Sequence, residues 1–482
     1  MINPMRKKEF YIIFGIILIA AFLRFYQLGS VPAGLYPDEA MNGNNALEAL
    51  KTGEWKVFYS ENNGREGLFM NTQALFLKVI GENEPWVLRL TSAVFGTFSV
   101  LGLFFLLFEL AGLAKINSPF LIAASGSFMM AVSFWHILFS RIGFRAVMAP
   151  FFLTWALYFL LLSFRKRWFR AALLSGVALG LGAYTYIAYR LMPFLLLLFI
   201  QPFRHKREFW HLAFGVFASA LIVFIPLGVF FATHPADFLG RTSQVSVFSS
   251  PNPSYELGKN ILLTIGMFFF RGDGNWRHNI AGSPQLFWPV ALLFAAGVVI
   301  AFKRHSIFDF TMLAWILLAS VPVVISNEGL PHALRSILMI PAVFGLAGSG
   351  ATSAYGFLDS RIRGARAHWF LVGVGAILLI QAYNAYFNIW AKTSDVRGAF
   401  AENYVEIGRE INSLPAAVPK YVVVRAGGVD VRGVPMPSQT VMFITDSFLP
   451  DGQSAQNITY LTKEEYERLG ALPIDAKVFF ID

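Results

Sequence analysis

The sequence predicts an all-α polytopic membrane protein with about eleven transmembrane helices, followed by a small α/β lobe at the C-terminal end. Hydrophobic residues make up 56% of the 482 residues and charged residues only 14%. Soluble domains carry about 25% charged residues, so lipid is the solvent that this composition fits. The second observation is a series of long apolar runs, and the third is a change to a more polar composition after about residue 391.

The first predicted span follows three basic residues, Arg6 to Lys8, and covers about 10–28. A cleaved signal peptide is disfavoured, because Arg24 and Tyr26 stand where small residues would be needed for cleavage. Further apolar runs long enough to span a bilayer lie near 87–110, 119–139, 147–164, 171–188, 190–203, 209–232, 286–302, 307–326, 334–356 and 369–390.

The placement of basic residues predicts the orientation of these spans. If the spans alternate, the connections on the N-terminal side and the N-terminus itself hold sixteen Lys and Arg, whereas the short opposite loops hold four. This bias predicts a multi-pass protein of the cell (plasma) membrane whose N-terminus is cytoplasmic. The net charge of +10 is then largely a topology signal, and no nucleic-acid partner is expected. The four exceptions are Arg141, Arg145, Arg190 and Arg335.

Two domains are expected, a transmembrane catalytic module over 1–390 and an extracytoplasmic α/β lobe over 391–482. The module carries long outer loops at about 29–86 and 233–285. In the lobe the patterns predict strands at Tyr421–Arg425, Thr440–Thr445 and Lys477–Ile481, and helices at Asp395–Leu414 and Thr462–Leu469. The chain has no Cys, which excludes disulfide frameworks and thiol chemistry.

The first outer loop carries the strongest candidate for chemistry, Pro37-Asp38-Glu39-Ala40. Ionisable residues crowded at a membrane boundary are costly and indicate function. A structural alternative stays open, because Pro and acids also suit the first turn of a helix, here one running through Leu47 and Leu50. Arg65 and Glu66 then precede an amphipathic stretch over 68–80, so the loop is expected to hold two interfacial helices beside a cleft.

These features together resemble a known family. An outward Asp-Glu after the first span, an interfacial helix and a Gly-Arg-Glu-Gly-Leu-Phe segment before Glu84-Pro85-Trp86 are similar to polyprenyl-phosphate-sugar-dependent glycosyltransferases of the C superfold (GT-C). The branch that they resemble contains the protein O-mannosyltransferases and the lipid A aminoarabinose transferases. Further similar segments are Ser140–Arg145, Tyr184–Tyr186 with Arg190, Gly272–Asn279, and Pro331–Arg335. The Trp-Trp-Asp signature of oligosaccharyltransferases is absent.

The resemblance implies a GT-C fold and a direct, inverting displacement of a sugar from a polyprenyl-phosphate carrier by a hydroxyl of a lipid, glycan or protein acceptor. Asp38 matches the family's general base, which takes the proton of the acceptor hydroxyl. Glu39 and Glu66 are expected to orient Asp38, to bind sugar hydroxyls or to hold a divalent cation, and these three roles stay open.

The leaving lipid phosphate calls for arginines, whose planar fork binds phosphate oxygens. Candidates for binding lipid phosphate or substrate are Arg65, Arg141, Arg145, Tyr184, Tyr186, Arg190, Asp273, Arg277, His278, Asn279, His332 and Arg335. For the arginines the alternative is contact with headgroups of membrane lipids, and for the tyrosines a place in the interfacial belt. The segment at 273–279 is expected to cap the cleft, the alternative being a solvated glycine turn.

Two other functional classes compete with the transferase. A transporter or flippase of lipid-linked sugars would also be polytopic, but it should place charges near the middle of its spans and carry paired broken helices. A non-catalytic scaffold would not need about eleven spans with acids and arginines at their outer ends. The charges of this chain gather at the outer ends of spans, which favours the enzyme.

Overall fold

The computed structural model describes residues 6–238, 246–327, 329–362, 365–470 and 472–482. Arg363, one of the sixteen basic residues that predict the orientation, lies outside these ranges. The chain divides into two compact units, which are described separately. Unit 1 contains Met1–Tyr26, Ser92–Ser140 and Arg145–Ile389, and unit 2 contains Gln27–Thr91, Arg141–Phe144 and Trp390–Asp482.

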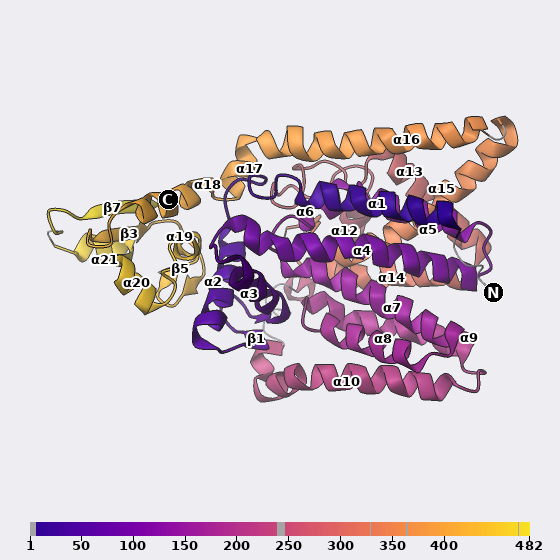
Figure 1. The fold of residues 1–482 in the computed structure, drawn as a ribbon, viewed down its shortest axis with the longest axis horizontal. Helices are drawn as coiled ribbons and strands as arrows, with labels where there is room; N and C mark the ends of the chain where they lie inside the picture. Colours follow the sequence, from indigo (N-terminus) through magenta and orange to yellow (C-terminus); the bar gives the residue numbers. More distant parts are fainter. Residues whose placement is uncertain (1–5, 239–245, 328, 363–364, 471) are drawn as a thin grey trace. The chain divides into compact units, whose positions relative to one another are not determined.

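Unit 1 is helical, and its long helices run side by side (Figure 1). Its elements are α1 (Lys7–Phe25), most of α4 (Pro85–Leu113), α5 (Pro119–Ala131), α6 (Phe134–Phe139), η1 (Arg145–Val147), α7 (Met148–Lys166), α8 (Phe169–Gly182), η2 (Ile187–Phe199), α9 (Ile200–Phe203), α10 (Phe209–Thr233), η3 (Val247–Ser249), α12 (Pro253–Gly266), α13 (Trp288–Arg304), α14 (Ile307–Val324), η4 (Ile337–Met339), α15 (Ile340–Ile362), α16 (Ala365–Tyr383) and η5 (Asn384–Ile389).

Several of these helices are suited to a lipid environment. Among the described residues, six helical segments are long and apolar enough to cross a membrane: Pro85–Leu113, Arg145–Lys166, Phe209–Thr233, Ile307–Val324, Ile337–Ile362 and Arg366–Lys392. The outer face of α10 shows why, because Trp210, Phe214 and Phe217 are 67–75% exposed. A soluble protein would not leave such a row of aromatic rings in water. The protein is an integral membrane protein.

The expected count of about eleven spans differs from the helices seen. The predicted span at 119–139 is divided into α5 and the short α6, since the helix ends at Ala131. The run at 190–203 lies mainly in the 3₁₀ segment η2, which contains Pro193, a residue that cannot donate a helical hydrogen bond. The helices in these two runs are therefore shorter or less regular than predicted, and the count of about eleven spans stays a prediction.

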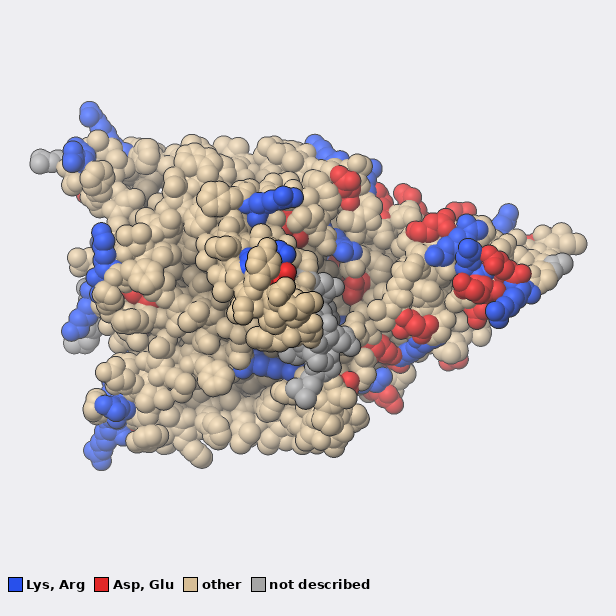
Figure 2. All heavy atoms as spheres, turned by 180° about the vertical axis from the view of Figure 1, so that it is seen from behind, with Lys and Arg blue, Asp and Glu red and all other residues tan. Residues whose placement is uncertain are grey.

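Charged side chains are unevenly placed on unit 1. On the face seen in Figure 2, much of its surface is uncharged, and Lys and Arg gather at one end of the helices. Helices α7 and α13 both end in basic residues, Arg165 and Lys166 in the first and Lys303 and Arg304 in the second. The predicted orientation of the chain in the membrane stays a prediction.

Unit 2 combines the first outer loop with the C-terminal residues. Its elements are α2 (Pro37–Thr52), β1 (Phe58–Tyr59), β2 (Arg65–Glu66), α3 (Leu68–Ile80), the first turns of α4, η6 (Trp390–Lys392), α17 (Ser394–Ala399), α18 (Glu402–Ser413), β3 (Lys420–Val424), β4 (Asp430–Val431), β5 (Val434–Pro435), α19 (Ser438–Ile444), α20 (Pro450–Gln456), β6 (Ile458–Thr462), α21 (Lys463–Arg468) and β7 (Lys477–Ile481). The three longer strands form a parallel sheet in the order β6-β3-β7.

The local signals of the loop are confirmed. Helix α2 begins with Pro37, carries Asp38 and Glu39 in its first turn, and ends at Gly53, whose φ of 78° is left-handed. Helix α3 covers the predicted amphipathic stretch and ends at Gly81 in the same conformation. Asp38 and Glu39 thus lie in the first turn of a helix, as the structural alternative predicted. This position leaves their chemical role open.

One strand prediction in the C-terminal residues is wrong. Residues 440–444 of the predicted strand Thr440–Thr445 lie in helix α19 and Thr445 is its C-cap; the helix packs against α2 and is buried on all sides. A fully buried helix shows no polar face, so its short apolar run resembles a strand in sequence. The predicted strands at Tyr421–Arg425 and Lys477–Ile481 correspond to β3 and β7, whereas β6 was not predicted.

Candidate functional site

Asp38 and Glu39 are neighbours in sequence with different surroundings in unit 2. Asp38 is half-buried, and Oδ1 accepts a hydrogen bond of 2.7 Å from the side-chain amide of Asn62. Glu39 is fully buried, and Oε2 lies 3.1 Å from Nε of Arg89 and 2.7 Å from the backbone nitrogen of Gly143. Asp38 is therefore the more accessible carboxylate of the two.

Arg89 is bonded to the loop before α2 at several points. Besides Glu39, its guanidinium donates to the carbonyls of Pro32 at 2.6 Å and Gly34 at 2.7 Å. The side chains of Arg89 and Glu39 are 1% and 0% exposed, so the pair is a buried ion pair whose other donors are also satisfied. Arg89 was not among the predicted site residues, because it lies inside the predicted span at 87–110, whereas Arg141 was marked by its place in a short outer loop.

Arg65, Glu66 and Arg141 are also buried in unit 2. Arg65 donates to the side-chain oxygens of Asn42 at 2.7 Å and Asn45 at 2.6 Å. Arg141 donates to the carbonyl of Val31 at 3.0 Å, and Glu66 is 3% exposed within β2. Arg65 and Glu39 belong to one polar network, because Asn42 bonds both Arg65 and the carbonyl of Gly143, whose backbone nitrogen donates to Glu39.

An arginine from the C-terminal residues joins this network. Arg432, in the turn between β4 and β5, lies 2.6 Å from Glu61 and 2.9 Å from Glu48 of α2. Burial opposes the ionisation of Glu61, but hydrogen bonds from Arg432 and its charge outweigh this and lower the pKa of Glu61. Glu61 is therefore ionised at neutral pH, directly before the Asn62 that binds Asp38. Arg432 is 371 residues from Glu61, and no local sequence pattern could have shown this pair.

The predicted residues in unit 1 lie in several places. Tyr184 donates through its hydroxyl to the carbonyl of Val223 at 2.7 Å and accepts from the backbone of Leu227, so it bridges α10 beside Pro226. Arg190 donates to the carbonyl of Phe238, whose ring centroid is 4.2 Å from its guanidinium carbon. Tyr186, Arg145, Arg277 and Arg335 are half-buried, and Arg335 donates to the hydroxyl of Ser326.

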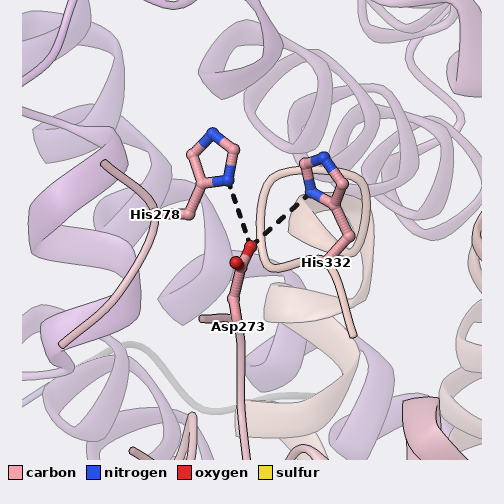
Figure 3. Close-up of side chains that lie close together, drawn as sticks. All are labelled: Asp273, His278 and His332. Carbon is pink, nitrogen blue, oxygen red and sulfur yellow. Dashed lines mark hydrogen bonds and ion pairs between the residues drawn. The ribbon is translucent and has the colours of Figure 1, made fainter. Parts of the chain in front are cut away.

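Three of the predicted residues meet at one point of unit 1, as Figure 3 shows. Asp273 Oδ2 lies 3.1 Å from Nδ1 of His278 and 3.7 Å from Nδ1 of His332. The ligand atoms of the three residues are all within 4.8 Å of one another, so among the described residues this group could hold a metal ion. Asn279, also predicted, donates to the carbonyl of Ser283 and supports the same loop.

Electrostatics favour the ionised form of Asp273. Burial raises its pKa, but the hydrogen bond from His278, the charges of His278 and His332 and the backbone N–H of Ala333 outweigh burial and lower it. The two rings stack with centroids 4.8 Å apart. Within the segment at 273–279, Asp273, His278 and Asn279 are buried, whereas Gly274 is exposed, so a solvated glycine turn describes Gly274 but not the side chains of the cluster.

Comparison with known proteins shows which solved structures have a similar fold. No protein-family model matches the chain, and a comparison with curated proteins finds no match. Among solved structures, ArnT from Cupriavidus metallidurans bound to undecaprenyl phosphate is similar with a TM-score of 0.55 and 15% identity, over 96% of this chain and 91% of that chain.

The oligosaccharyltransferase AglB from Archaeoglobus fulgidus, in complex with an inhibitory peptide and a dolichol-phosphate, is similar with a TM-score of 0.54 and 13% identity over 95% of this chain. The chain has the fold of the GT-C glycosyltransferases. It spans 65% of the length of AglB, and identities of 13–15% show the fold alone. The expected fold class is confirmed in this coarse form.

Proposed function

We propose that this GT-C-fold chain is a glycosyltransferase that moves a sugar from a polyprenyl-phosphate carrier to a hydroxyl of a lipid, glycan or protein acceptor, with Asp38 as general base. The observation that carries the proposal is the difference between the surroundings of Asp38 and those of Glu39. Its carboxylate is half-buried and held by Asn62, whereas the adjacent Glu39 is fully buried in an ion pair with Arg89. A base needs such an oriented yet accessible oxygen.

The carrier is proposed from the fold neighbours and from the arginines. ArnT was solved with undecaprenyl phosphate and AglB with dolichol-phosphate, and both have this fold. Arg145, Arg190, Arg277 and Arg335 are half-buried cations of unit 1, and we propose that some of them bind the phosphate of the donor. Tyr186 is proposed to contact the sugar or the lipid.

The roles proposed for the buried residues are supported by their contacts. In this proposal Glu39, Arg65 and Arg141 hold the loop that presents Asp38, because their side chains are bonded to neighbouring segments of the chain. Glu66 keeps the roles of binding sugar hydroxyls or a divalent cation. The sites are proposed to face the outside of the cell membrane.

The test is replacement of Asp38 by Asn, which removes the base and retains an oxygen for the hydrogen bond from Asn62. Membranes of the source cells that express either form are supplied with extracted polyprenyl-phosphate sugars. Release of free polyprenyl phosphate is then measured by mass spectrometry, because this product does not depend on which sugar is moved. We expect a loss of about 10²–10⁴-fold for Asp38→Asn.

The matched control is Glu54→Gln, which neutralises an exposed carboxylate of the same loop just after α2 and should leave the rate unchanged. Near-wild-type release by Asp38→Asn would overturn the assignment of the base. A donor that crosses the membrane with its sugar-phosphate bond intact would instead indicate a flippase.

A further inference from the structure

A buried cluster of unit 1 lies where two loops that are far apart in sequence meet. Asp273 and His278 belong to the loop between α12 and α13, and His332 belongs to the connection between α14 and η4. Asp273 is 3% and His278 is 8% exposed, and the His332 side chain is 15% exposed. Two imidazoles and one carboxylate are a donor set that Zn²⁺ uses in proteins.

The loop around Asp273 is fixed before any ligand arrives. Asp273 Oδ1 accepts from the backbone nitrogen of Asn275 at 2.8 Å, and its carbonyl accepts from that of Gly282 at 2.8 Å. Gly272 lies so close to the carbonyl of Ser283 that a Cβ there would be 2.3 Å from its oxygen. These contacts leave Oδ2 as the carboxylate oxygen that faces the two histidines (Figure 3).

The second loop is equally supported. The carbonyl of Ala333 accepts from the indole nitrogen of Trp135 at 3.0 Å, and its backbone nitrogen donates to Asp273 Oδ2 at 2.9 Å. The hydroxyl of Ser336 donates to the carbonyl of His332 at 2.9 Å. Such outer contacts orient the residues that bind a metal and are a regular part of metal sites.

His332 is the ligand candidate that the second loop contributes. His332 Nδ1 lies 3.4 Å from the backbone nitrogen of Arg335, a long contact that an ion bound at Nδ1 would replace. The same atom lies 3.7 Å from Asp273 Oδ2, too far for a hydrogen bond. A cation bound between Oδ2 and the Nδ1 atoms of both histidines would attract the carboxylate of Asp273 and would link the two loops.

The ligand atoms lie within 4.8 Å of one another, and two of the distances between them are near the spacing that a transition ion requires. Ligand atoms around tetrahedral Zn²⁺ lie about 3.3 Å apart, given metal–ligand bonds of about 2.0–2.2 Å. The distances of 3.1 and 3.7 Å from the carboxylate oxygen to the two nitrogens bracket this value. The rings are inclined by 28°, so binding requires them to rotate until both lone pairs meet at one point. Mg²⁺ prefers an all-oxygen octahedron and does not fit this donor set.

We propose that Asp273, His278 and His332 bind one divalent transition ion of the Zn²⁺ class, which joins the two loops of unit 1 and stabilises them. The proposal does not depend on the proposed sugar transfer or on Asp38. Binding of the ion requires both histidines to present unprotonated Nδ1 atoms, and the ion replaces the proton that His278 now shares with Asp273.

The test measures binding and stability on the full chain, purified in detergent with a tag that contains no histidine. The protein is stripped with a chelator and then titrated with Zn²⁺, with Mg²⁺ in parallel, and bound metal is counted by mass spectrometry. We expect one Zn²⁺ per chain and a higher unfolding temperature with Zn²⁺ but not with Mg²⁺, because a ligand that binds only the folded state stabilises it.

The variants are His278→Gln, His332→Gln and Asp273→Asn, and the matched control is His205→Gln at an exposed position. The three variants should lose the bound zinc and its thermal effect, whereas the control should keep both. Absence of stoichiometric zinc in the wild type, or zinc that remains in the double variant His278→Gln/His332→Gln, would overturn the proposal. If a variant fails to fold, the comparison of Zn²⁺ with Mg²⁺ on the wild type still decides.

Discussion

Asp38 and Glu39 show how one residue step along a helix separates two carboxylates into different environments. Successive helical residues are turned by about 100°, so Asp38 reaches Asn62 while Glu39 points to Arg89 and Gly143. Glu39 Oε1 has no hydrogen-bond partner among the described residues, and its Oε2 carries the ion pair. The two acids therefore predict different results on mutation.

Replacement of Glu39 by Gln should destabilise the protein, because it leaves the Arg89 guanidinium buried without its counter-charge. Removal of one partner of a buried pair costs about 3–5 kcal/mol. The unfolding temperature in detergent checks this, with Asp38→Asn as the control that should unfold near the wild-type temperature. Equal stability of the two variants, with activity lost in both, would move Glu39 into the chemistry.

At the scale of elements, the turn between β4 and β5 acts as a clamp on the first outer loop. Arg432 binds Glu48 on α2 and Glu61 beside Asn62, and its guanidinium carbon lies 4.3 Å from the ring centroid of Phe448. Helix α19 adds to this contact through Gln439, which accepts from Asn44 at 3.0 Å. The C-terminal residues thereby hold the helix that carries Asp38.

Replacement of Arg432 by Ala should lower the transfer rate several-fold and reduce stability only modestly, since partly exposed pairs contribute about 0–1 kcal/mol each. The reason is that Glu61, freed from Arg432, no longer fixes the Asn62 that orients Asp38. Rates of polyprenyl-phosphate release in membranes measure the effect. Arg425→Ala is the control, because the described contacts of the Arg425 side chain are with Asp482 and Phe480, away from α2 and Glu61 in the sequence.

The pKa of Glu61 decides the pH at which Arg432→Ala should be compared with the wild type. Its pKa is lowered in the folded protein, so the stabilisation from the Arg432 pair is fully present above the ordinary pKa of Glu and is lost as the pH falls through the lowered value. Measurements at neutral pH therefore report the intact clamp. An unchanged rate for Arg432→Ala at neutral pH would contradict the positioning role.

The elements that could be predicted from sequence are those with local signals. Helices α2 and α3 have Pro, acidic first turns or closing glycines, and β3 and β7 have β-branched and aromatic runs. Helix α19 was missed because its burial on all sides hides the helical period. In the site, the cluster at Asp273 is partly local, but the pairs of Arg432 and of Arg89 with Glu39 depend on long-range packing that no spacing reveals.

At the scale of the whole molecule, the sequence predicts which side of the membrane each loop faces. The fold alone does not test this prediction. The sixteen basic residues assigned to the N-terminal side should be cytoplasmic, and α2 and the residues after 391 should lie outside. The apolar faces of α10 and α16 indicate lipid contact but are the same for either orientation, because hydrocarbon has no direction.

The natural absence of cysteine makes this prediction simple to test. Single cysteines are introduced at exposed positions, Glu54→Cys and Ser454→Cys for the predicted outside and His205→Cys for the predicted inside. A membrane-impermeant maleimide added to intact cells should label the first two and not the third, and all three should react after the cells are opened. Because the parent chain has no thiol, any label on it comes from the introduced residue. Labelling of His205→Cys alone in intact cells would reverse the orientation and would place Asp38 on the cytoplasmic side, where the donor would have to be presented from the other leaflet.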